Sequence, residues 1–265
     1  MQGSCLCGGV RFTAEPPLRP VIACHCTQCR KTSGHFWAAT AVPLDRFRLT
    51  GSATLRWYRS SATARRGFCG GCGASLFWQP EGEDRISIAA GALDGPTGLT
   101  LAEDWFLEDA GDYYTTPQPA ESLQGACLCG ANRFTLPGPM GEVGACHCRQ
   151  CRKLSGHFSA SFDADEGAVT WLARSVSEYV TPGGGQRGFC PGCGSSLYFR
   201  AADGGFSIEA GAIANPTGGR LVSHIFTADK GDYYQIADGL PQFPGWDEAG
   251  PPLPTPAGPL PFLGS

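Results

Sequence analysis

An internal repeat is the feature that most constrains the fold of this chain. The thirteen residues CHCTQCRKTSGHF at 24–36 return as CHCRQCRKLSGHF at 146–158, with eleven identical positions. Nearly the same shift relates RGFCGGCGASLF to RGFCPGCGSSLY, and the first GDYY segment to the second. A period of about 120 residues is too long for a solenoid and predicts a duplicated domain. We expect domains at 1–118 and 122–244, joined by a connection at 119–124.

A proline-rich tail, residues 245–265, is expected after the second domain. The last 18 residues, EAGPPLPTPAGPLPFLGS, contain six prolines, which exclude a helix or a central strand. We expect a disordered or polyproline-like tail, and a ligand for a proline-binding domain is the alternative.

The pattern within the first copy predicts strands. Six short segments are rich in β-branched and aromatic residues and are separated by Gly, Pro or Asp. They are 10–15, 35–42, 47–51, 54–60, 75–80 and 85–93. Only 27–33 is predicted to form a helical turn, and the 38 glycines fit many tight turns. The fold class is therefore mainly β with few helices.

The overall charge and hydropathy point to a small-molecule partner. The formal net charge is −4, and neither half carries more Lys and Arg than Asp and Glu, so nucleic acid is not expected as a partner. No run of 18 apolar residues predicts a membrane span, and MQGSCLCGG does not resemble a signal peptide. We expect a cytoplasmic protein with no membrane partner.

The fourteen cysteines divide into seven per copy, an odd number that cannot pair completely into disulfides. A reducing cytosol and the Cys-x-Cys spacings favour metal instead. The Cys-x-x-Cys-Gly segments at 69–73 and 190–194 are typical of zinc knuckles. If Cys5 and Cys7 close a four-thiolate site with the first knuckle, Cys24, Cys26 and Cys29 remain as three ligands with one open position, as in a catalytic zinc site. Spacing equally allows Cys5, Cys7, Cys24 and Cys26 to form the closed site, with Cys29, Cys69 and Cys72 open.

The ordered motifs resemble the glutathione-dependent formaldehyde-activating enzyme and centromere protein V family. SCLCGGVRF, CHCTQCRKTSGHF, RRGFCGGCGASLFW and ISIAAGALD carry the resemblance in the first copy, and their counterparts carry it in the second. The resemblance implies two tandem Mss4-like (β-tent) domains, each with one structural and one catalytic zinc, hence four Zn²⁺ per chain. The implied structural ligands are Cys5, Cys7, Cys69, Cys72, Cys127, Cys129, Cys190 and Cys193. The implied catalytic ligands are Cys24, Cys26, Cys29, Cys146, Cys148 and Cys151.

The resemblance also implies an activity, the condensation of glutathione with formaldehyde to S-(hydroxymethyl)glutathione, which is classed with the carbon–sulfur lyases. Zinc with an exchangeable position can lower the pKa of a bound thiol or polarise an aldehyde oxygen. The expected partners are therefore a small thiol, glutathione or a relative, and an aldehyde. The alternatives are a non-catalytic interaction module in which zinc only stabilises the fold, and a thiol redox sensor.

Two basic pairs follow the three-cysteine motifs. Arg30 and Lys31, with Arg152 and Lys153, are predicted to bind the carboxylates of glutathione, because guanidinium binds carboxylate bidentately. The alternative is a solvated surface pair.

The histidines of the repeat are predicted to support the structure. His25 and His147 alternate with the cysteines and should point away from them into a packing or supporting role. His35 and His157 are predicted to be hydrogen-bonded core residues, with a general base as the alternative.

The two copies end differently. The second has Ser-His-Ile-Phe at 223–226, close to the ending expected of the family, and later Gly-Leu-Pro-Gln-Phe at 239–243. The first has Glu-Asp-Trp-Phe at 103–106 and then runs into the connection. We therefore expect the first domain to differ in substrate or activity.

Overall fold

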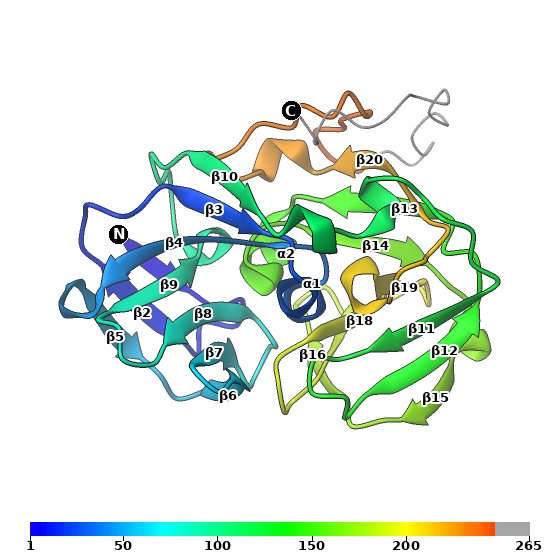
Figure 1. The fold of residues 1–265 in the computed structure, drawn as a ribbon, viewed down its shortest axis with the longest axis horizontal. Helices are drawn as coiled ribbons and strands as arrows, with labels where there is room; N and C mark the ends of the chain where they lie inside the picture. Colours follow the sequence, from blue (N-terminus) through cyan, green and yellow to red (C-terminus); the bar gives the residue numbers. More distant parts are fainter. Residues whose placement is uncertain (247–265) are drawn as a thin grey trace.

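The structure is a computed structural model in which residues 1–246 are described, and each copy of the repeat forms one small and one large β-sheet (Figure 1). In the first copy the three-stranded sheet has the order β1 (Gln2–Ser4), β2 (Arg11–Ala14), β5 (Phe47–Gly51). The seven-stranded sheet has the order β10 (Leu101–Trp105), β3 (Val21–Cys24), β4 (Trp37–Pro43), β9 (Arg85–Ala89), β8 (Ser75–Pro80), β7 (Ala64–Cys69), β6 (Leu55–Ser61). All pairings are antiparallel except β10 with β3.

The second copy repeats this plan. Its small sheet has the order β11 (Ser122–Ala126), β12 (Arg133–Pro137), β15 (Thr170–Ala173). Its large sheet has the order β16 (Ser177–Val180), β17 (Gln186–Phe189), β18 (Ser196–Arg200), β19 (Phe206–Glu209), β14 (Ser159–Asp163), β13 (Glu142–Cys146), β20 (Arg220–Ile225). The β13–β20 pair is parallel, as β3–β10 is. The prediction of two tandem, mainly β domains is confirmed.

Helices are few and short. Within residues 1–246, the α-helices are α1 (Thr27–Ser33) and α2 (Arg149–Ser155). Short 3₁₀ helices lie at η1 (Leu44–Arg46), η2 (Ala90–Ala92), η3 (Leu107–Asp109), η4 (Asp112–Tyr114), η5 (Glu166–Ala168), η6 (Ala210–Ala212) and η7 (Thr227–Asp229). None of the helices within residues 1–246 is long and apolar enough to cross a bilayer.

Glycine ends each α-helix at the same place in the repeat. Gly34 and Gly156 adopt left-handed backbone with φ of 90° and 88°, which side chains with a Cβ rarely adopt. Each glycine amide donates back to the carbonyl oxygen of the residue four positions earlier, Arg30 or Arg152. The glycine that follows each three-cysteine motif therefore fixes the C-terminal end of a two-turn helix.

The two helices lie at the centre of the molecule, where the copies meet (Figure 1). The amide of Gly91, in η2, donates to Gly156 O at 2.8 Å, and the amide of Gly211, in η6, donates to Gly34 O at 2.7 Å. A Cβ atom on Gly91 would lie 2.4 Å from the Arg152 carbonyl oxygen, so only glycine allows this approach. Each copy thus holds the helix end of the other.

A second pair of contacts joins the turns of the two copies. The Asp232 carboxylate accepts hydrogen bonds from the Thr97 and Gly98 amides at 2.6 and 2.8 Å. The Asp112 carboxylate accepts from the Thr217 amide and hydroxyl at 2.9 and 2.6 Å. The GDYY segment of each copy therefore caps the Pro-Thr-Gly turn of the other.

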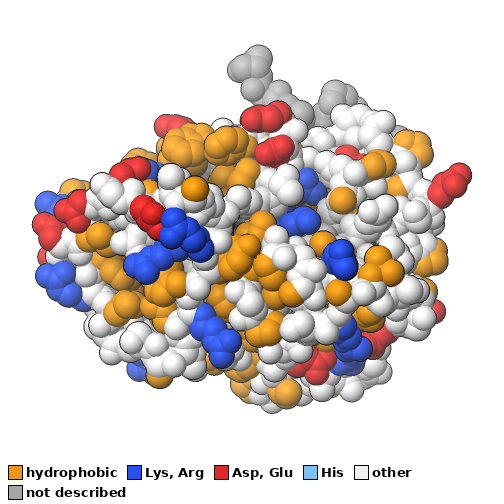
Figure 2. All heavy atoms as spheres, turned by 60° about the horizontal axis from the view of Figure 1, so that its bottom comes forward, with side chains coloured by type: hydrophobic (Ala, Val, Ile, Leu, Met, Phe, Trp, Pro, Cys, Tyr) orange, Lys and Arg blue, Asp and Glu red, His pale blue; other side chains and the backbone are white. Residues whose placement is uncertain are grey.

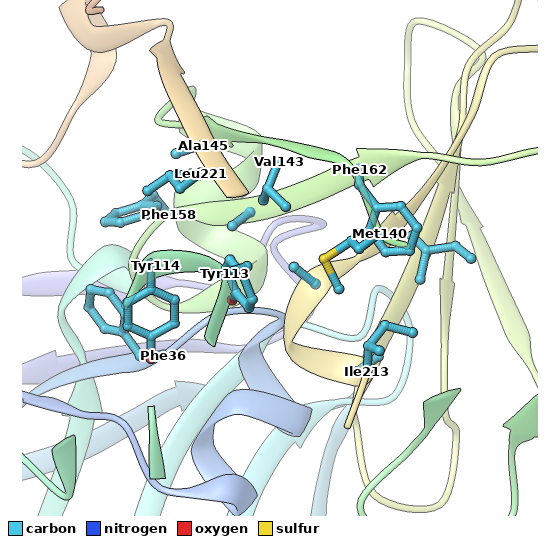
Figure 3. Close-up of a cluster of buried hydrophobic side chains, with 14 of the residues drawn as sticks. Phe36, Tyr113, Tyr114, Met140, Val143, Ala145, Phe158, Phe162, Ile213 and Leu221 are labelled. Atoms are coloured by element: carbon cyan, nitrogen blue, oxygen red, sulfur yellow. The ribbon is translucent and has the colours of Figure 1, made fainter. Parts of the chain in front are cut away.

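The hydrophobic core also crosses this junction. One cluster of buried side chains combines Phe36, Tyr113 and Tyr114 of the first copy with Phe158 and Leu221 of the second (Figure 3). Burial of apolar surface is the main stabilising contribution in folding, so the two copies share part of their stability. The proposed boundaries at 118 and 122 remain a prediction, and most of the predicted tail, 247–265, lies outside the described residues.

Candidate metal centres and the cavity between the copies

The fourteen thiols gather into four clusters, and within each the Sγ atoms lie within 4.8 Å of one another. Of the two groupings allowed by spacing, the structure forms the one that joins the Cys-x-Cys pair to the knuckle. The four-thiol clusters are Cys5, Cys7, Cys69, Cys72 and Cys127, Cys129, Cys190, Cys193. The three-thiol clusters are Cys24, Cys26, Cys29 and Cys146, Cys148, Cys151.

The four-thiol clusters have the environment of a closed metal site. Three of the four thiols in each cluster are buried, and donors surround them. The Val10 amide donates to Cys5 Sγ at 3.2 Å, and the Thr54 hydroxyl lies 3.1 Å from Cys69 Sγ. Four thiols at this separation with N–H groups aimed at sulfur fit a tetrahedral zinc that fastens the N-terminal strand to the knuckle.

The three-thiol clusters are built at the junction of a strand and a helix. Cys24 ends β3, Cys26 caps α1, and Cys29 lies in the first turn of α1. Cys24 and Cys26 are partly exposed, whereas Cys29 is buried. The same strand end, cap and first turn position Cys146, Cys148 and Cys151. Two accessible thiols over one buried thiol leave a side of each cluster open to an incoming ligand.

These thiols stabilise negative charge among themselves. Hydrogen bonds from the Cys24 and Cys29 thiols lower the pKa of Cys26 to about 2, and the same contacts raise the pKa of Cys24. In the second copy the pKa of Cys148 is likewise lowered to about 2. Soft thiolate donors in a set of three suit a zinc that keeps one position for another ligand.

A buried arginine stands beside each three-thiol cluster, a feature that our sequence analysis missed. Arg66, in β7, directs Nη2 at Cys29 Sγ, 3.5 Å away, and Arg187, in β17, directs Nη2 at Cys151 Sγ, 3.6 Å away. Both side chains are about 7% exposed. Burial alone would lower the pKa of either guanidinium, but the adjacent thiolate outweighs burial and raises the pKa. The repeated Arg-Gly-Phe-Cys segment was the signal that could have revealed these arginines.

The histidines next to the cysteines point away from the thiols into hydrogen-bonded chains. His25 Nδ1 lies 3.0 Å from the Tyr114 hydroxyl, and His25 Nε2 lies 3.0 Å from Asp104 Oδ1. In the second copy His147 contacts Tyr234 and His224, at 2.6 and 2.9 Å. His224 in turn contacts Asp238 at 2.7 Å. A carboxylate thus ends both chains, directly in the first copy and one histidine further on in the second.

The histidines of the SGHF segments are buried in the shared core. His35 lies 2.7 Å from the Tyr113 hydroxyl, and His157 lies 2.8 Å from the Tyr233 hydroxyl. Burial keeps the pKa of both histidines well below its ordinary value, so both are neutral. In each copy the two tyrosines of the GDYY segment are therefore hydrogen-bond partners of the two histidines of the repeated motif. The sequence did not reveal this pairing.

The four predicted substrate-binding residues occupy two kinds of environment. The Arg30 guanidinium is buried and donates to Asp109 O at 2.8 Å and to the Asn215 side chain at 3.3 Å. The Lys153 ammonium is also buried and donates to the Ala92 carbonyl oxygen and the Asp94 carboxylate. Both side chains link the copies. Lys31 and Arg152, their counterparts in the repeat, are partly exposed.

A cavity of about 1000 Å³ opens where the first copy faces the three-thiol cluster of the second. The second copy contributes Cys148, Arg149, Gln150 and Lys153 from the start of α2, with Phe226 and Asp229. The opposite wall belongs to the first copy and includes the segment 2–8, Arg11 and Asp94. A ligand that reached Cys148 through this cavity would touch both copies.

The molecular surface has no continuous basic face on the side shown in Figure 2. Lys and Arg side chains lie there in separate groups between apolar and uncharged side chains.

Comparisons with known proteins match both copies of the repeat to one family. The chain matches the family described as "Glutathione-dependent formaldehyde-activating enzyme" twice, over residues 1–109 and 122–229. An uncharacterized lyase of Schizosaccharomyces pombe is 25% identical over 122 residues, which is 45% of this chain and 89% of the yeast protein. A crystal structure of a Rhodobacter sphaeroides protein covers 40% of this chain and 99% of its own length, with 25% identity and a TM-score of 0.32.

Proposed function

Because the chain belongs to the glutathione-dependent formaldehyde-activating enzyme family, we propose that it is a zinc-dependent lyase of carbon–sulfur bonds. Its substrates are a small thiol, glutathione or a relative, and an aldehyde, and the product resembles S-(hydroxymethyl)glutathione. The observation that carries the proposal is that Cys148, one thiol of the three-thiol cluster of the second copy, lines a substrate-sized cavity. The name of the yeast relative, a lyase, supports the same class of reaction.

The reaction balances without an oxidant. The thiol gives up its proton, its sulfur bonds to the aldehyde carbon, and the electron pair of the carbonyl double bond moves to the oxygen, which takes a proton. The reverse steps cleave the carbon–sulfur bond. Zinc held by the three thiols would supply a position where a thiol is acidified or an aldehyde oxygen is polarised.

The protein's own residues hold that centre in place. Cys146, Cys148 and Cys151 offer three soft donors, and the Arg187 guanidinium, 3.6 Å from Cys151 Sγ, offsets part of their negative charge. Excess negative charge on three thiolates would weaken the attraction of a metal for a further anionic ligand. Arg187, and Arg66 in the first copy, therefore favour the binding of a substrate thiolate.

The cavity suits an anionic thiol. Arg11 of the first copy and Arg149 of the second line it, and both side chains are exposed. Arg11 Nε donates to Gly8 O at 3.1 Å, which leaves its two Nη atoms to meet a substrate carboxylate bidentately. The predicted role of Arg30, Lys31, Arg152 and Lys153 in binding substrate stays a prediction. Arg30 and Lys153 already donate to protein acceptors.

A panel of thiols and aldehydes tests the proposal on the wild type and on Cys151→Ser and Cys29→Ser. Adduct formation followed by NMR should fall at least about a hundredfold in Cys151→Ser, because one of three metal ligands is lost. Cys29→Ser reports whether the first copy also turns over. Unchanged turnover in both variants, with the fold retained by circular dichroism, would refute the proposal.

A matched pair of arginine variants tests the cavity. Arg11→Ala should raise KM for glutathione about tenfold with little change in kcat. Arg133, the counterpart of Arg11 in the repeat, is not among the residues that line this cavity, so Arg133→Ala should leave KM unchanged. Equal effects of the two variants would place substrate elsewhere.

A further inference from the structure

The outer edge of β20, in the second copy, is covered by a later segment of the same chain, residues 239–245. The His224 amide donates to Pro241 O at 2.9 Å, and the Phe243 amide donates to His224 O at 2.8 Å. Further on, the Phe226 and Thr227 amides donate to the carbonyl oxygens of residues 245 and 243. Residues 221–224 of β20 are buried.

The matching edge of β10, in the first copy, is met among residues 1–246 only at its start, by Tyr233 of the second copy, and is open from Asp104 onward. After its GDYY segment the chain runs on to β11 and does not return along β10. All of β10 after Leu101 is exposed, and Trp105 and Phe106 have exposed fractions of 45% and 49%. Two large apolar side chains beside an open strand edge are a site for another segment.

The backbone groups on that edge are those that β20 uses. Trp105 O accepts from the His25 amide on the β3 side, as Ile225 O accepts from the His147 amide in the second copy. Because successive residues of a parallel strand bond to opposite sides, the N–H and C=O of Asp104 face outward, like those of His224. Within residues 1–246, the Leu101 amide at the start of this edge donates to Tyr233 O of the second copy at 2.6 Å, and no hydrogen bond reaches the outward backbone groups of Asp104.

The end of the chain contains a segment that fits this edge. Residues 239–245 read GLPQFPG, and residues 258–264 read GPLPFLG. The two heptapeptides share glycine at both ends and phenylalanine at the fifth position. We propose that residues 258–264 complete the first copy by pairing along β10, with Phe262 in the place that Phe243 takes on β20.

The prolines of the tail do not oppose this pairing. Along β20 the covering segment donates one amide, that of Phe243, and otherwise offers carbonyl oxygens. In the tail the aligned residue is Phe262, which has an N–H group, whereas Pro259 and Pro261 fall where no donor is used. Every backbone group used along β20 is therefore present in the tail.

The charges fit as well. In the second copy the residue before the covering segment, Asp238, ends the hydrogen-bond chain from His147 through His224. In the first copy Asp104 takes the place of His224 and contacts His25 directly. The aligned tail residue is Ala257, so no second carboxylate would be brought against Asp104.

The tail is long enough. Residues 247–257 separate the last described residue from the heptapeptide, and eleven residues can span about 36 Å when extended. Strands β10 and β20 lie on the same side of the molecule, the upper side in Figure 1. The heptapeptide can thus reach β10 within one chain.

Amide hydrogen exchange resolved by residue tests the proposal on the full chain and on a chain that ends after Trp246. The amides of Asp104, Phe106 and Leu107 should exchange at least about tenfold faster in the shortened chain. Phe262→Pro, which removes the one required donor, should have the same effect. Leu263→Pro is the matched control, because position 263 aligns with Pro244, and it should keep the protection.

The amide of His224, on the edge covered by residues 239–245, is an internal reference that should not change. Equal exchange at the three β10 amides in all four proteins would overturn the proposal. Protection that rises with protein concentration would also overturn it, because a second copy of the chain would then cover β10.

Discussion

Replacing Lys153 with methionine tests how the two copies are held together. The ammonium is about 4% exposed and lies between the copies, on the wall of the cavity. It donates to Ala92 O at 2.8 Å, to Asp94 Oδ1 at 2.5 Å, and to the carbonyl and hydroxyl oxygens of Ser4 at 3.2 and 3.1 Å. Methionine keeps the length of the side chain and removes all four hydrogen bonds.

The cost follows from what remains unpaired. Breaking a buried ion pair by removing one partner costs about 3–5 kcal/mol, and a hydrogen bond to a charged group about 1.5–3 kcal/mol. The Asp94 side chain is 38% exposed, so water can solvate it and the cost falls toward the lower values. We expect the free energy of unfolding to fall by about 2–4 kcal/mol, which lowers Tm by roughly 5–15 °C in a chain of this size.

Urea denaturation and thermal unfolding of Lys153→Met and Lys31→Met measure this difference. Lys31 is the counterpart of Lys153 in the repeat, and where Lys153 meets Asp94 the other copy has Ala214. Lys31→Met should therefore change stability by less than about 0.5 kcal/mol. Equal stability of the two variants, with a raised KM only in Lys153→Met, would refute the structural role and support the predicted binding role.

Three further predictions concern metal, pH and packing. A chelator should remove zinc from the partly exposed three-thiol clusters before it removes zinc from the buried four-thiol clusters. Elemental analysis should therefore show the zinc content falling from about four to about two ions per chain before the circular dichroism spectrum changes. Burial keeps the pKa of His35 and His157 below the unfolded value of about 6.5. As pH falls, both histidines therefore bind a proton in the unfolded chain while they stay neutral in the native chain. In urea titrations, each histidine should lower the free energy of unfolding by about 1.4 kcal/mol as pH falls from 7.5 to 5.5. His157→Asn should remove the contribution of one histidine, so its free energy of unfolding should fall by about 1.4 kcal/mol less over the same pH range. Gly194→Ala should lower Tm more than Gly130→Ala does. Both glycines have positive φ, but only at Gly194 would the new Cβ meet a side chain, that of Phe68, at 2.5 Å.

The local structure was predictable because it depends on nearby residues. All six strands expected in the first copy exist, as β2, β4, β5, β6, β8 and β9. The helical turn expected at 27–33 is α1, and Gly34 ends it. The grouping of thiols needed the structure, because the distance between Cys5 and Cys69 depends on how the sheets fold.

Contacts between the copies could not be read from local patterns. The sequence marked GDYY as a repeat, but nothing in its spacing shows that Asp112 caps a turn of the other copy. The same holds for the tyrosines that contact His25 and His35, which lie 89 and 78 residues away. Arg30 and Lys153 follow the same motif as their partly exposed counterparts, so composition could not show that they are buried.

The identical Arg-Lys pairs of the two helices are used differently because the turns that face them differ at two adjacent positions. Where the turn of the second copy has Asn215, which accepts from Arg30, the turn of the first copy has Gly95, which has no side chain to accept a hydrogen bond. Where the first copy has Asp94 against Lys153, the second has Ala214. Two substitutions in a turn therefore decide which basic side chain of each helix binds the other copy and which stays available. A duplicated site can acquire different surroundings in this way while all seven of its thiols stay unchanged.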